Sequence, residues 1–277
     1  MSHQATELGR VTEMLRTNAQ QTAFYEAPLA GRGNLVTRTW RRARHAQIRV
    51  RKAVGIDEWI YQLHLTWMGE LSNKRVLDLG CYAGNPLSLF LAKNSKSYLG
   101  IDLSKPAIEE LQSKLQDRGI SHAEARAVDF LSPEFTENDF DIIYAHSVAH
   151  HFRYFDVLLQ MLNARLKCGG KVITYDPMST SLPVSMARKL YRPFQSDKEW
   201  EFPFTKQTFR DIQRYFRIVS VQGTLGYSKW ALPLAIINTS LATSVAKLLH
   251  SRDLKSATAL GPGIWRCILV SMCWEKL

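Results

Sequence analysis

Three predicted strands in the first half of the chain carry a carboxylate at or near their ends: Asp78, Asp102 and Asp129. An acid at the end of the second strand of an open α/β sheet can accept hydrogen bonds from both hydroxyls of a ribose, which is the role expected of Asp102. Asp129, after the third strand, can accept a hydrogen bond from an adenine amino group. The apolar residues that follow these two acids, Leu103 and Phe130, are placed to hold the base between them. The pattern therefore predicts a nucleoside site.

A glycine-containing turn follows the first of these strands, in the sequence VLDLGCYAGN at residues 76–85. Gly80 permits a sharp turn and the close approach of a ligand to the backbone. A helix is predicted to begin after the small residues Ala83 and Gly84. In open α/β sheets, ligands bind outside the carboxyl ends of the strands, near this first turn.

Histidines and an acid follow the next two predicted strands. The sequence AHSVAHHF at residues 145–152 follows the fourth strand, and Asp176 ends the fifth. Histidine is suited to remove a proton near neutral pH, and an acid beside it can orient the ring or act as a second base. Nothing beyond this group has the spacing of metal ligands, and the four cysteines lack CxxC spacing, so neither a metal site nor a disulfide framework is expected.

The elements that must position these residues alternate between strands and helices. Strands are predicted at 75–79, 97–101, 124–128, 140–145 and 171–175, with helices at 86–93, 105–118 and 154–166. This alternation indicates parallel βαβ units in a doubly wound sheet. Two later strands, predicted at 217–221 and 266–274, can complete its far edge, and a helix is expected from Thr205 to Tyr215.

Helical additions flank this region on both sides. Residues 1–72 are predicted to form an N-terminal extension, and residues 73–277 a second domain with an insertion at about 227–263. In the extension, an amphipathic helix is expected to begin near an N-cap at Asp57. The insertion contains a largely apolar stretch at 230–249, but Pro233 and its interior polar residues favour a pocket lid or a peripheral membrane contact over a spanning helix.

From about Lys74 to Val221, the chain resembles the class I S-adenosylmethionine (SAM)-dependent methyltransferases. The resemblance implies a Rossmann-like, seven-stranded and mostly parallel sheet whose last strand is antiparallel. It also implies SAM as the cofactor and S-adenosylhomocysteine (SAH) as the product. The residues expected around the cofactor are Asp78, Gly80, Cys81, Tyr82, Ala83, Gly84, Asn85, Asp102, Leu103, Asp129, Phe130 and Ala145. The common family form has glycine where this chain has Tyr82.

An NAD-dependent dehydrogenase is the main competing interpretation, because it shares the acid at the end of the second strand. Such an enzyme needs the sequence GxGxxG to receive a pyrophosphate at a helix N-terminus. Tyr82 replaces the second of these glycines. Because SAM carries no phosphate, the change is compatible with a methyltransferase and not with a dehydrogenase.

The paired histidines after the fourth strand, with an acid at the end of the fifth, resemble small-molecule O-methyltransferases, including some that act on sugar hydroxyls. This resemblance implies His150 as the general base and Asp176 as its partner. His151 and His146 are further catalytic candidates. The sequence lacks both the Asp/Asn-Pro-Pro-Tyr/Phe motif and the Pro-Cys pair of nucleic-acid methyltransferases, yet the methylated atom remains open between oxygen, nitrogen and carbon.

A net charge of +11 arises largely between residues 27 and 56, which hold eight bases, most of them between Arg38 and Lys52, and no acid. Such a block predicts an anionic or amphiphilic acceptor, an acidic membrane surface or RNA as the neighbour, or else a solvated surface. An RNA methyltransferase, an enzyme of lipid-linked acceptors and a non-catalytic partner subunit therefore stay as alternatives. The N-terminus lacks a secretory pattern, which favours the cytoplasm, with peripheral membrane attachment left open. The oligomeric state is not predicted.

Overall fold

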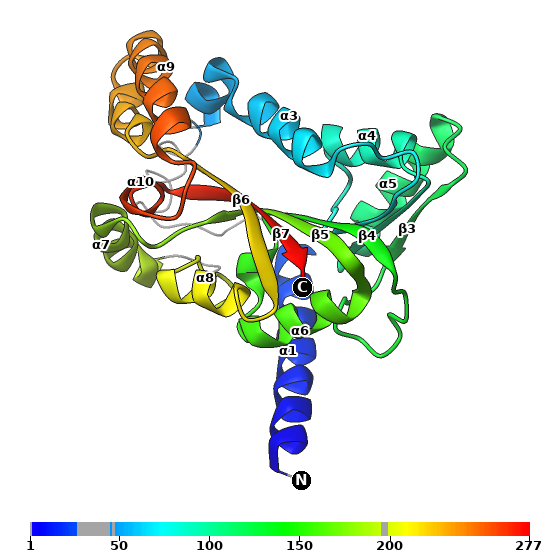
Figure 1. Ribbon diagram of the computed structural model, residues 1–277. Coiled ribbons are helices and arrows are strands. Elements are labelled where there is room, and N and C mark those ends of the chain that lie inside the picture. Colours follow the sequence, from blue (N-terminus) through cyan, green and yellow to red (C-terminus); the bar gives the residue numbers. More distant parts are fainter. Residues whose placement is uncertain (1, 27–44, 46–47, 195–198) are drawn as a thin grey trace.

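A central sheet lies between two layers of helices in the computed structural model (Figure 1), which describes residues 2–26, 45, 48–194 and 199–277. The seven strands are β1 (Arg75–Leu79), β2 (Ser97–Asp102), β3 (Ala123–Ala127), β4 (Phe140–His146), β5 (Leu166–Pro177), β6 (Phe216–Thr224) and β7 (Leu269–Lys276). Their order across the sheet is β3-β2-β1-β4-β5-β7-β6. All pairs from β3 to β5 are parallel, and β7 is antiparallel to both β5 and β6. The predicted Rossmann-like sheet, with its last strand antiparallel, is confirmed.

Each face of the sheet is covered by its own group of helices (Figure 1). One face packs against α3 (Ile56–Met68), α4 (Pro86–Asn94) and α5 (Lys105–Asp117), through buried side chains such as Leu91 and Leu111. The other packs against α1 (Ser2–Glu26), α6 (Phe155–Arg165) and α8 (Lys206–Ile212), through Met14, Leu158 and Phe209 among others. Burial on both faces explains why central strands such as β1 and β4 are mostly apolar in sequence, whereas the edge strand β3 carries charged residues and is largely exposed.

The N-terminal segment does not form one layer. Helix α1 lies beside α6, whereas α3 lies on the opposite face of the sheet (Figure 1). The expected N-cap at Asp57 is wrong, because α3 is preceded by Gly55, which has φ +77° and makes no side-chain cap. Asp57 instead lies in the first turn and forms an ion pair with Arg51. A carboxylate in the first turn of a helix interacts favourably with the positive end of the helix dipole. Asp57 can therefore stabilise α3 without capping it.

Two helical segments follow the carboxyl ends of β5 and β6. After β5 come α7 (Leu182–Tyr191) and the short 3-10 helix η2 (Arg192–Phe194). After β6 come two 3-10 helices, η3 (Ser228–Ala231) and η4 (Pro233–Ile236), then α9 (Thr239–Ser256) and α10 (Pro262–Trp265). A further 3-10 helix, η1 (Ala149–His151), follows β4. None of the helices in the described ranges combines the length and apolar character needed to cross a bilayer.

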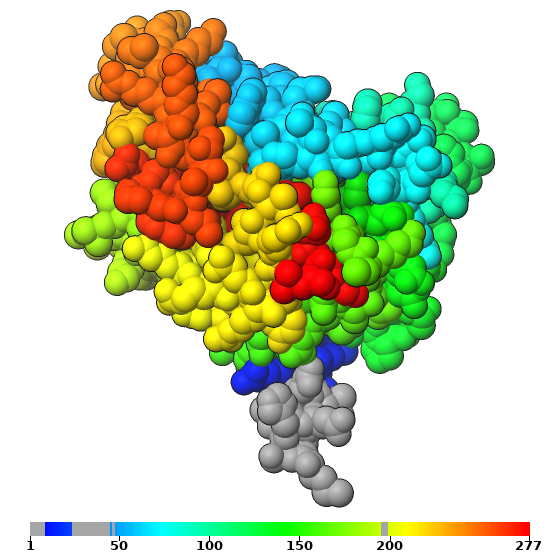
Figure 2. Space-filling view, in the orientation of Figure 1, coloured from blue at the N-terminus to red at the C-terminus, as the bar shows by residue number. Residues whose placement is uncertain are grey.

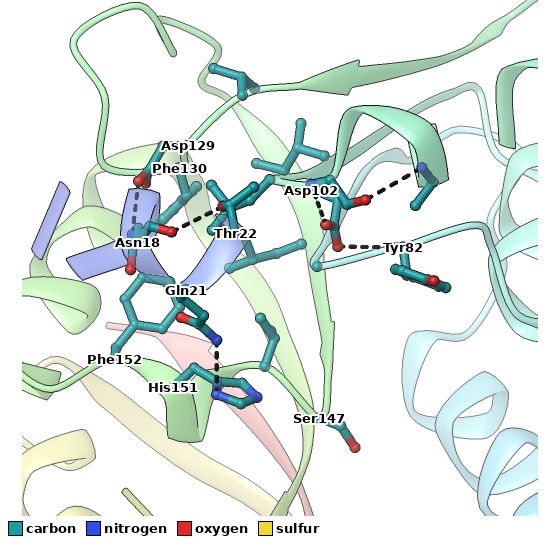
Figure 3. Close-up of a pocket in the computed structure, with 18 of the residues that line it drawn as sticks. Asn18, Gln21, Thr22, Tyr82, Asp102, Asp129, Phe130, Ser147, His151 and Phe152 are labelled. Atoms are coloured by element: carbon teal, nitrogen blue, oxygen red, sulfur yellow. Dashed lines mark hydrogen bonds between the residues drawn. The ribbon is translucent and has the colours of Figure 1, made fainter. Parts of the chain in front are cut away.

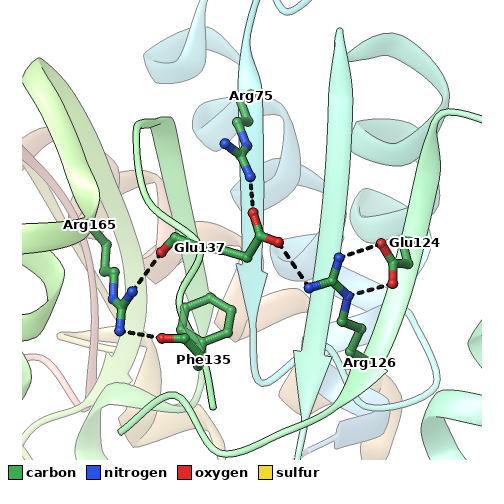
Figure 4. A network of polar contacts seen from close by, with 6 residues as sticks. All are labelled: Arg75, Glu124, Arg126, Phe135, Glu137 and Arg165. Carbon is green, nitrogen blue, oxygen red and sulfur yellow. Dashed lines mark hydrogen bonds and ion pairs between the residues drawn. The ribbon is translucent and has the colours of Figure 1, made fainter. Parts of the chain in front are cut away.

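An ion-pair network links β1 and β3 with the loop before β4 (Figure 4). Glu137 in that loop pairs with Arg75 of β1 and with Arg126 of β3, in the latter case at 2.9 Å. Arg126 also contacts Glu124 on the same strand. The hydrogen bond from Arg126 holds the pKa of Glu137 below its ordinary value. The network spans β2 and adds charge to the β3 edge of the sheet, where charged side chains oppose pairing with another strand.

Candidate active site

A cavity of about 660 Å³ opens at the carboxyl ends of β1, β2 and β3 (Figure 3). This volume is typical of small-molecule and cofactor sites. The residues that line it come from α1, the turn after β1, the ends of β2 and β3, the first part of α5 and the loop after β4. They are Asn18, Gln21, Thr22, Leu79, Gly80, Tyr82, Ile101, Asp102, Leu103, Ser104, Pro106, Ala107, Glu110, Val128, Asp129, Phe130, Ser147, Val148, His151 and Phe152.

Backbone geometry shapes two sides of this cavity. Gly80 has φ +70°, and a Cβ there would lie 2.6 Å from Cγ2 of Val148, so the turn after β1 has no room for a side chain. Tyr82 and Ser147 also adopt left-handed conformations, with φ values of +48° and +60°. Such conformations cost non-glycine residues about 1–2 kcal/mol. Glycine would adopt the conformation of Tyr82 without this cost.

Both acids assigned to the nucleoside lie in the cavity wall. Oδ2 of Asp102 accepts a hydrogen bond of 2.9 Å from the backbone N–H of Tyr82, which ties the end of β2 to the β1 turn. Oδ2 of Asp129 accepts one of 2.8 Å from the side-chain amide of Asn18 (Figure 3). Burial raises the pKa of Asp129, and the bond from Asn18 opposes that rise.

The cavity is suited to a positively charged nucleoside. Its wall contains three carboxylates, Asp102, Glu110 and Asp129, and none of its described residues is Lys or Arg. SAM carries a sulfonium and an ammonium group, whereas NAD carries a pyrophosphate that requires cations or a glycine-rich helix start. The residues present therefore fit SAM.

Six residues expected around the cofactor are not part of the wall: Asp78, Cys81, Ala83, Gly84, Asn85 and Ala145. Asp78 is fully enclosed and accepts a 2.8 Å hydrogen bond from the hydroxyl of Tyr98. Burial raises its pKa to about 6. Asn85 caps α4, since its side chain accepts from the N–H groups of Leu87 and Ser88. Gly84 has φ +75°, and a Cβ there would lie 2.7 Å from Leu111 of α5. These residues hold the cavity's supporting turn in place.

His150 and Asp176 form a buried pair at the ends of β4 and β5. Nδ1 of His150 lies 2.8 Å from Oδ1 of Asp176, and the backbone N–H of His150 donates to the same oxygen at 3.1 Å. A carboxylate can only accept at this position, so Nδ1 carries the proton and Nε2 is left as the basic nitrogen. His150 does not itself line the cavity.

Among the described residues that line the cavity, His151 is the one histidine (Figure 3). Its Nδ1 lies 2.7 Å from the carbonyl oxygen of Trp200 and 3.3 Å from Nε2 of Gln21. A carbonyl only accepts, so Nδ1 is protonated and the shorter contact fixes the tautomer. The rings of His150 and His151 are in contact but tilted by 37°, with centroids 4.1 Å apart.

His146 lies outside the cavity wall, in an aromatic cluster beneath α3. Its ring is 5.1 Å from that of Tyr175 and 6.4 Å from that of His64. Burial lowers the pKa of His146 to about 4 and that of His64 to about 3. A base of such low pKa is mostly unprotonated but weak at neutral pH, so the geometry favours His150 and His151 for proton transfer.

Asn18, Gln21 and Thr22 of α1 were not expected at the site. They stand more than fifty residues before β1, and polar residues on one face of a terminal helix give no signal that they face a ligand. Most of the basic block, from Arg32 to Arg44, lies outside the described residues. Arg51 is described, and it donates to Asp57 and to the hydroxyl of Tyr175. No three His, Cys, Asp or Glu side chains in the described ranges are grouped closely enough to hold a metal ion.

Comparisons with known proteins agree with this geometry. A family described as "Methyltransferase domain" matches residues 77–172. An uncharacterised protein of Haemophilus influenzae is 25% identical over 68% of this chain and 70% of its own length. The uncharacterised methyltransferase YcgJ of Bacillus subtilis is 26% identical over 51% of this chain, and the match spans 60% of YcgJ, less than two thirds of its length.

Solved structures share the fold at low identity. The crystal structure of YcgJ superposes with a TM-score of 0.52 and 19% identity, over 78% of this chain and 97% of that one. Coclaurine N-methyltransferase, solved with N-methylheliamine and SAH, superposes with a TM-score of 0.54 and 14% identity, over 78% and 72% of the two chains.

Proposed function

Because this chain belongs to the class I SAM-dependent methyltransferases, we propose that it methylates a hydroxyl group of a small-molecule acceptor. The observation that carries the proposal is the His150–Asp176 pair at the carboxyl ends of β4 and β5, next to the cavity. An amine that is already neutral needs no base, whereas a hydroxyl gains from one that removes its proton.

In this proposal, different residues of the cavity bind different parts of SAM. Asp102 would hold the ribose hydroxyls and Asp129 the adenine amino group, with Leu103 and Phe130 against the base. When bound, SAM supplies a methyl group on a positively charged sulfur, which a nucleophile can attack. The turn at Gly80 would receive the methionine end, supported from behind by Asp78, Cys81, Ala83, Gly84, Asn85 and Ala145.

Proton removal falls to His150 in this proposal. Asp176 holds the Nδ1–H, so Nε2 would take the proton of the acceptor hydroxyl while its oxygen bonds to the methyl carbon, the carbon–sulfur bond breaks and SAH is released. Asp176 also stabilises the imidazolium that results, as an adjacent carboxylate does for other catalytic histidines. His151, which faces the cavity from the next position, is the alternative base. We also propose that residues 1–72 form an extension and residues 73–277 the SAM-binding domain, with α1 of the extension contributing to the cavity.

The methylated atom can be identified directly. The protein is incubated with SAM labelled with ¹³C in its methyl group and with a protein-free metabolite extract, and the labelled products are examined by ¹H–¹³C correlation NMR. The chemical shift of the methyl carbon distinguishes attachment to oxygen, nitrogen or carbon. We expect an O-methyl product.

Parallel reactions with total RNA and with lipid extract serve as comparison. Label on nitrogen or carbon would contradict the hydroxyl acceptor, and label confined to RNA would replace the small-molecule acceptor. If SAH binds tightly but no substrate mixture is labelled, the partner-subunit alternative gains support instead.

A further inference from the structure

Helix α7 carries a row of apolar side chains that the rest of the described chain does not cover. Leu182, Met186 and Leu190 recur every four residues, so they lie along one side of the helix. They are 72%, 57% and 77% exposed, and no residue of α7 is buried. A helix of a folded domain normally buries such a row against the core.

A second group of exposed apolar side chains lies on the segment after β6. It includes Trp230 of η3, and Ile236 and Ile237 around the end of η4, the last of these 86% exposed. Leu241 and Leu248 extend it along α9, two turns apart. The same segment buries Ala231, Ala242 and Ala246 in a small cluster with Val50, so the exposed apolar side chains are ones that this cluster does not take in.

The two groups belong to one side of the molecule. Nζ of Lys229 in η3 donates to the hydroxyl of Ser181, the residue that precedes α7, at 3.3 Å. Lys229 also donates to the carbonyl of Arg266, next to α10. Figures 1 and 2 show α7, α10 and α9 following one another along that side. Monomeric proteins rarely expose apolar groups gathered over neighbouring elements in this way unless they bind something there.

Charge on these segments has a single sign. Residues 178–194 contain no acid, and residues 225–268 contain only Asp253. Asp253 is buried and accepts hydrogen bonds from the backbone N–H groups of Gly226 and Ser228, so it holds the start of the segment rather than meeting solvent. The exposed charges are cations, among them Lys189, Lys247, Arg252 and Lys255.

We propose that the face formed by α7, η3, η4 and α9 docks on the surface of an anionic lipid bilayer. Exposed apolar side chains combined with cations characterise helices that lie in the membrane interface, with apolar groups in the acyl boundary and basic groups near the headgroups. A second copy of the chain would bring cations against cations on the same face, which disfavours self-association. The face borders the carboxyl ends of β5 and β6, but the proposal does not depend on the reaction.

Vesicle binding of the full-length protein tests this proposal. Sedimentation with vesicles of phosphatidylglycerol and phosphatidylcholine is expected to carry the protein down, with much weaker binding to phosphatidylcholine alone and in high salt, where surface charges are screened. A variant with Leu182→Gln, Met186→Gln and Leu190→Gln should lose binding by about tenfold or more, because three apolar side chains no longer leave water. Lys247→Gln with Lys255→Gln should reduce the preference for anionic vesicles.

Phe90→Gln is the matched control, since Phe90 is an exposed apolar residue of α4, away from this face. Its vesicle binding should equal that of the unaltered protein, and circular dichroism verifies that each variant is folded. Equal binding of the triple variant and the control would overturn the proposal, as would the absence of binding to either vesicle. A concentration-dependent dimer that the triple variant no longer forms would assign the face to a second copy instead.

Discussion

Asp102 is the single residue on which nucleoside binding should depend most. Asp102→Ala removes the proposed acceptor of both ribose hydroxyls, and loss of a hydrogen bond to a charged group weakens binding by about 1.5–3 kcal/mol, or roughly 10- to 150-fold. Calorimetric titration with SAH measures this. Asp117→Ala, at the exposed end of α5, is the control and should bind SAH normally. An unchanged affinity for Asp102→Ala means that another group holds the ribose.

His150 should matter for turnover and little for cofactor affinity. His150→Ala is expected to lower kcat by about 10²–10⁴-fold, the usual contribution of general base catalysis, with SAH affinity nearly unchanged. Asp176→Asn should cost less, because the amide oxygen can still accept from Nδ1 of His150. Rapid-mixing assays with the acceptor found by the labelling experiment provide the rates.

The variant His151→Ala distinguishes which of the two adjacent histidines acts as the general base. If His151→Ala lost the larger share of kcat, the base would be the residue that lines the cavity. Full activity in both variants would leave positioning of the acceptor as the source of the rate.

The sequence predicts site residues that follow a strand end, but not residues that reach the site from a distant part of the chain. The acids Asp102 and Asp129 were predicted from their places at strand ends, and both line the cavity. Asn18 and Gln21 could not be predicted, because their contacts with Asp129 and His151 join residues more than a hundred positions apart. A helix that crosses a cavity leaves the same polar pattern as one that faces water.

At the scale of an element, the turn after β1 should tolerate no side chain at Gly80. Gly80→Ala adds a Cβ 2.6 Å from Val148 and also forces alanine into a conformation with φ +70°. Gly119→Ala separates the two effects, because Gly119 has φ +64° and nothing within 4 Å of an added Cβ. That control should lower the free energy of unfolding by about 1–2 kcal/mol, and Gly80→Ala by more.

A compensating substitution makes the steric part measurable. Val148→Ala in the Gly80→Ala background should recover part of the difference between the two glycine variants, because it removes Cγ2 at 2.6 Å but leaves Cβ of residue 148 at 2.8 Å. It should not recover the cost of the backbone strain. Urea unfolding curves give the values. Equal losses at Gly80 and Gly119 would show that the turn shifts freely and that contact with Val148 is not what requires glycine.

Apolar runs in the sequence predict where most of the strands lie, but not where each strand begins and ends. The fifth strand was predicted at residues 171–175, whereas β5 begins at Leu166 and continues to Pro177. Its additional start pairs Leu166 with Phe140, and the register then shifts before Ile142 pairs with Lys171. The run of Cys168, Gly169 and Gly170 has no strand pattern of its own. Gly169 has φ +69° and the register shifts here, so these residues form an irregularity within β5 that the sequence pattern does not show.

At the scale of the whole molecule, buried histidines should make the fold sensitive to acid. The pKa values of His64 and His146 fall from 6.5 to about 3 and about 4 on folding. Between pH 6.5 and about 4, the unfolded chain therefore binds protons that the folded chain does not, so stability falls as the pH falls. Asp78 opposes this below pH 6, because its pKa rises from 3.8 to about 6 on folding.

The combined effect of the two histidines is larger than the opposing effect of Asp78. We therefore expect the free energy of unfolding to fall by roughly 2–3 kcal/mol between pH 7 and pH 5. His64→Gln should reduce that loss by about 2 kcal/mol, whatever its stability at pH 7. His122→Gln, at an exposed turn residue, is the matched control substitution. Denaturant unfolding at several pH values measures it, and equal slopes for the two variants would exclude His64 as the source.

The contribution of α1 to the cavity wall has a practical consequence for selective inhibition. Asn18, Gln21 and Thr22 lie outside residues 77–172, the part of the chain that matches the shared domain family. A nucleoside analogue that occupied only the shared part would meet similar walls in many methyltransferases. One extended from the adenine toward these three polar side chains would reach groups that the shared segment does not supply, so its discrimination between enzymes would come from the first twenty-six residues.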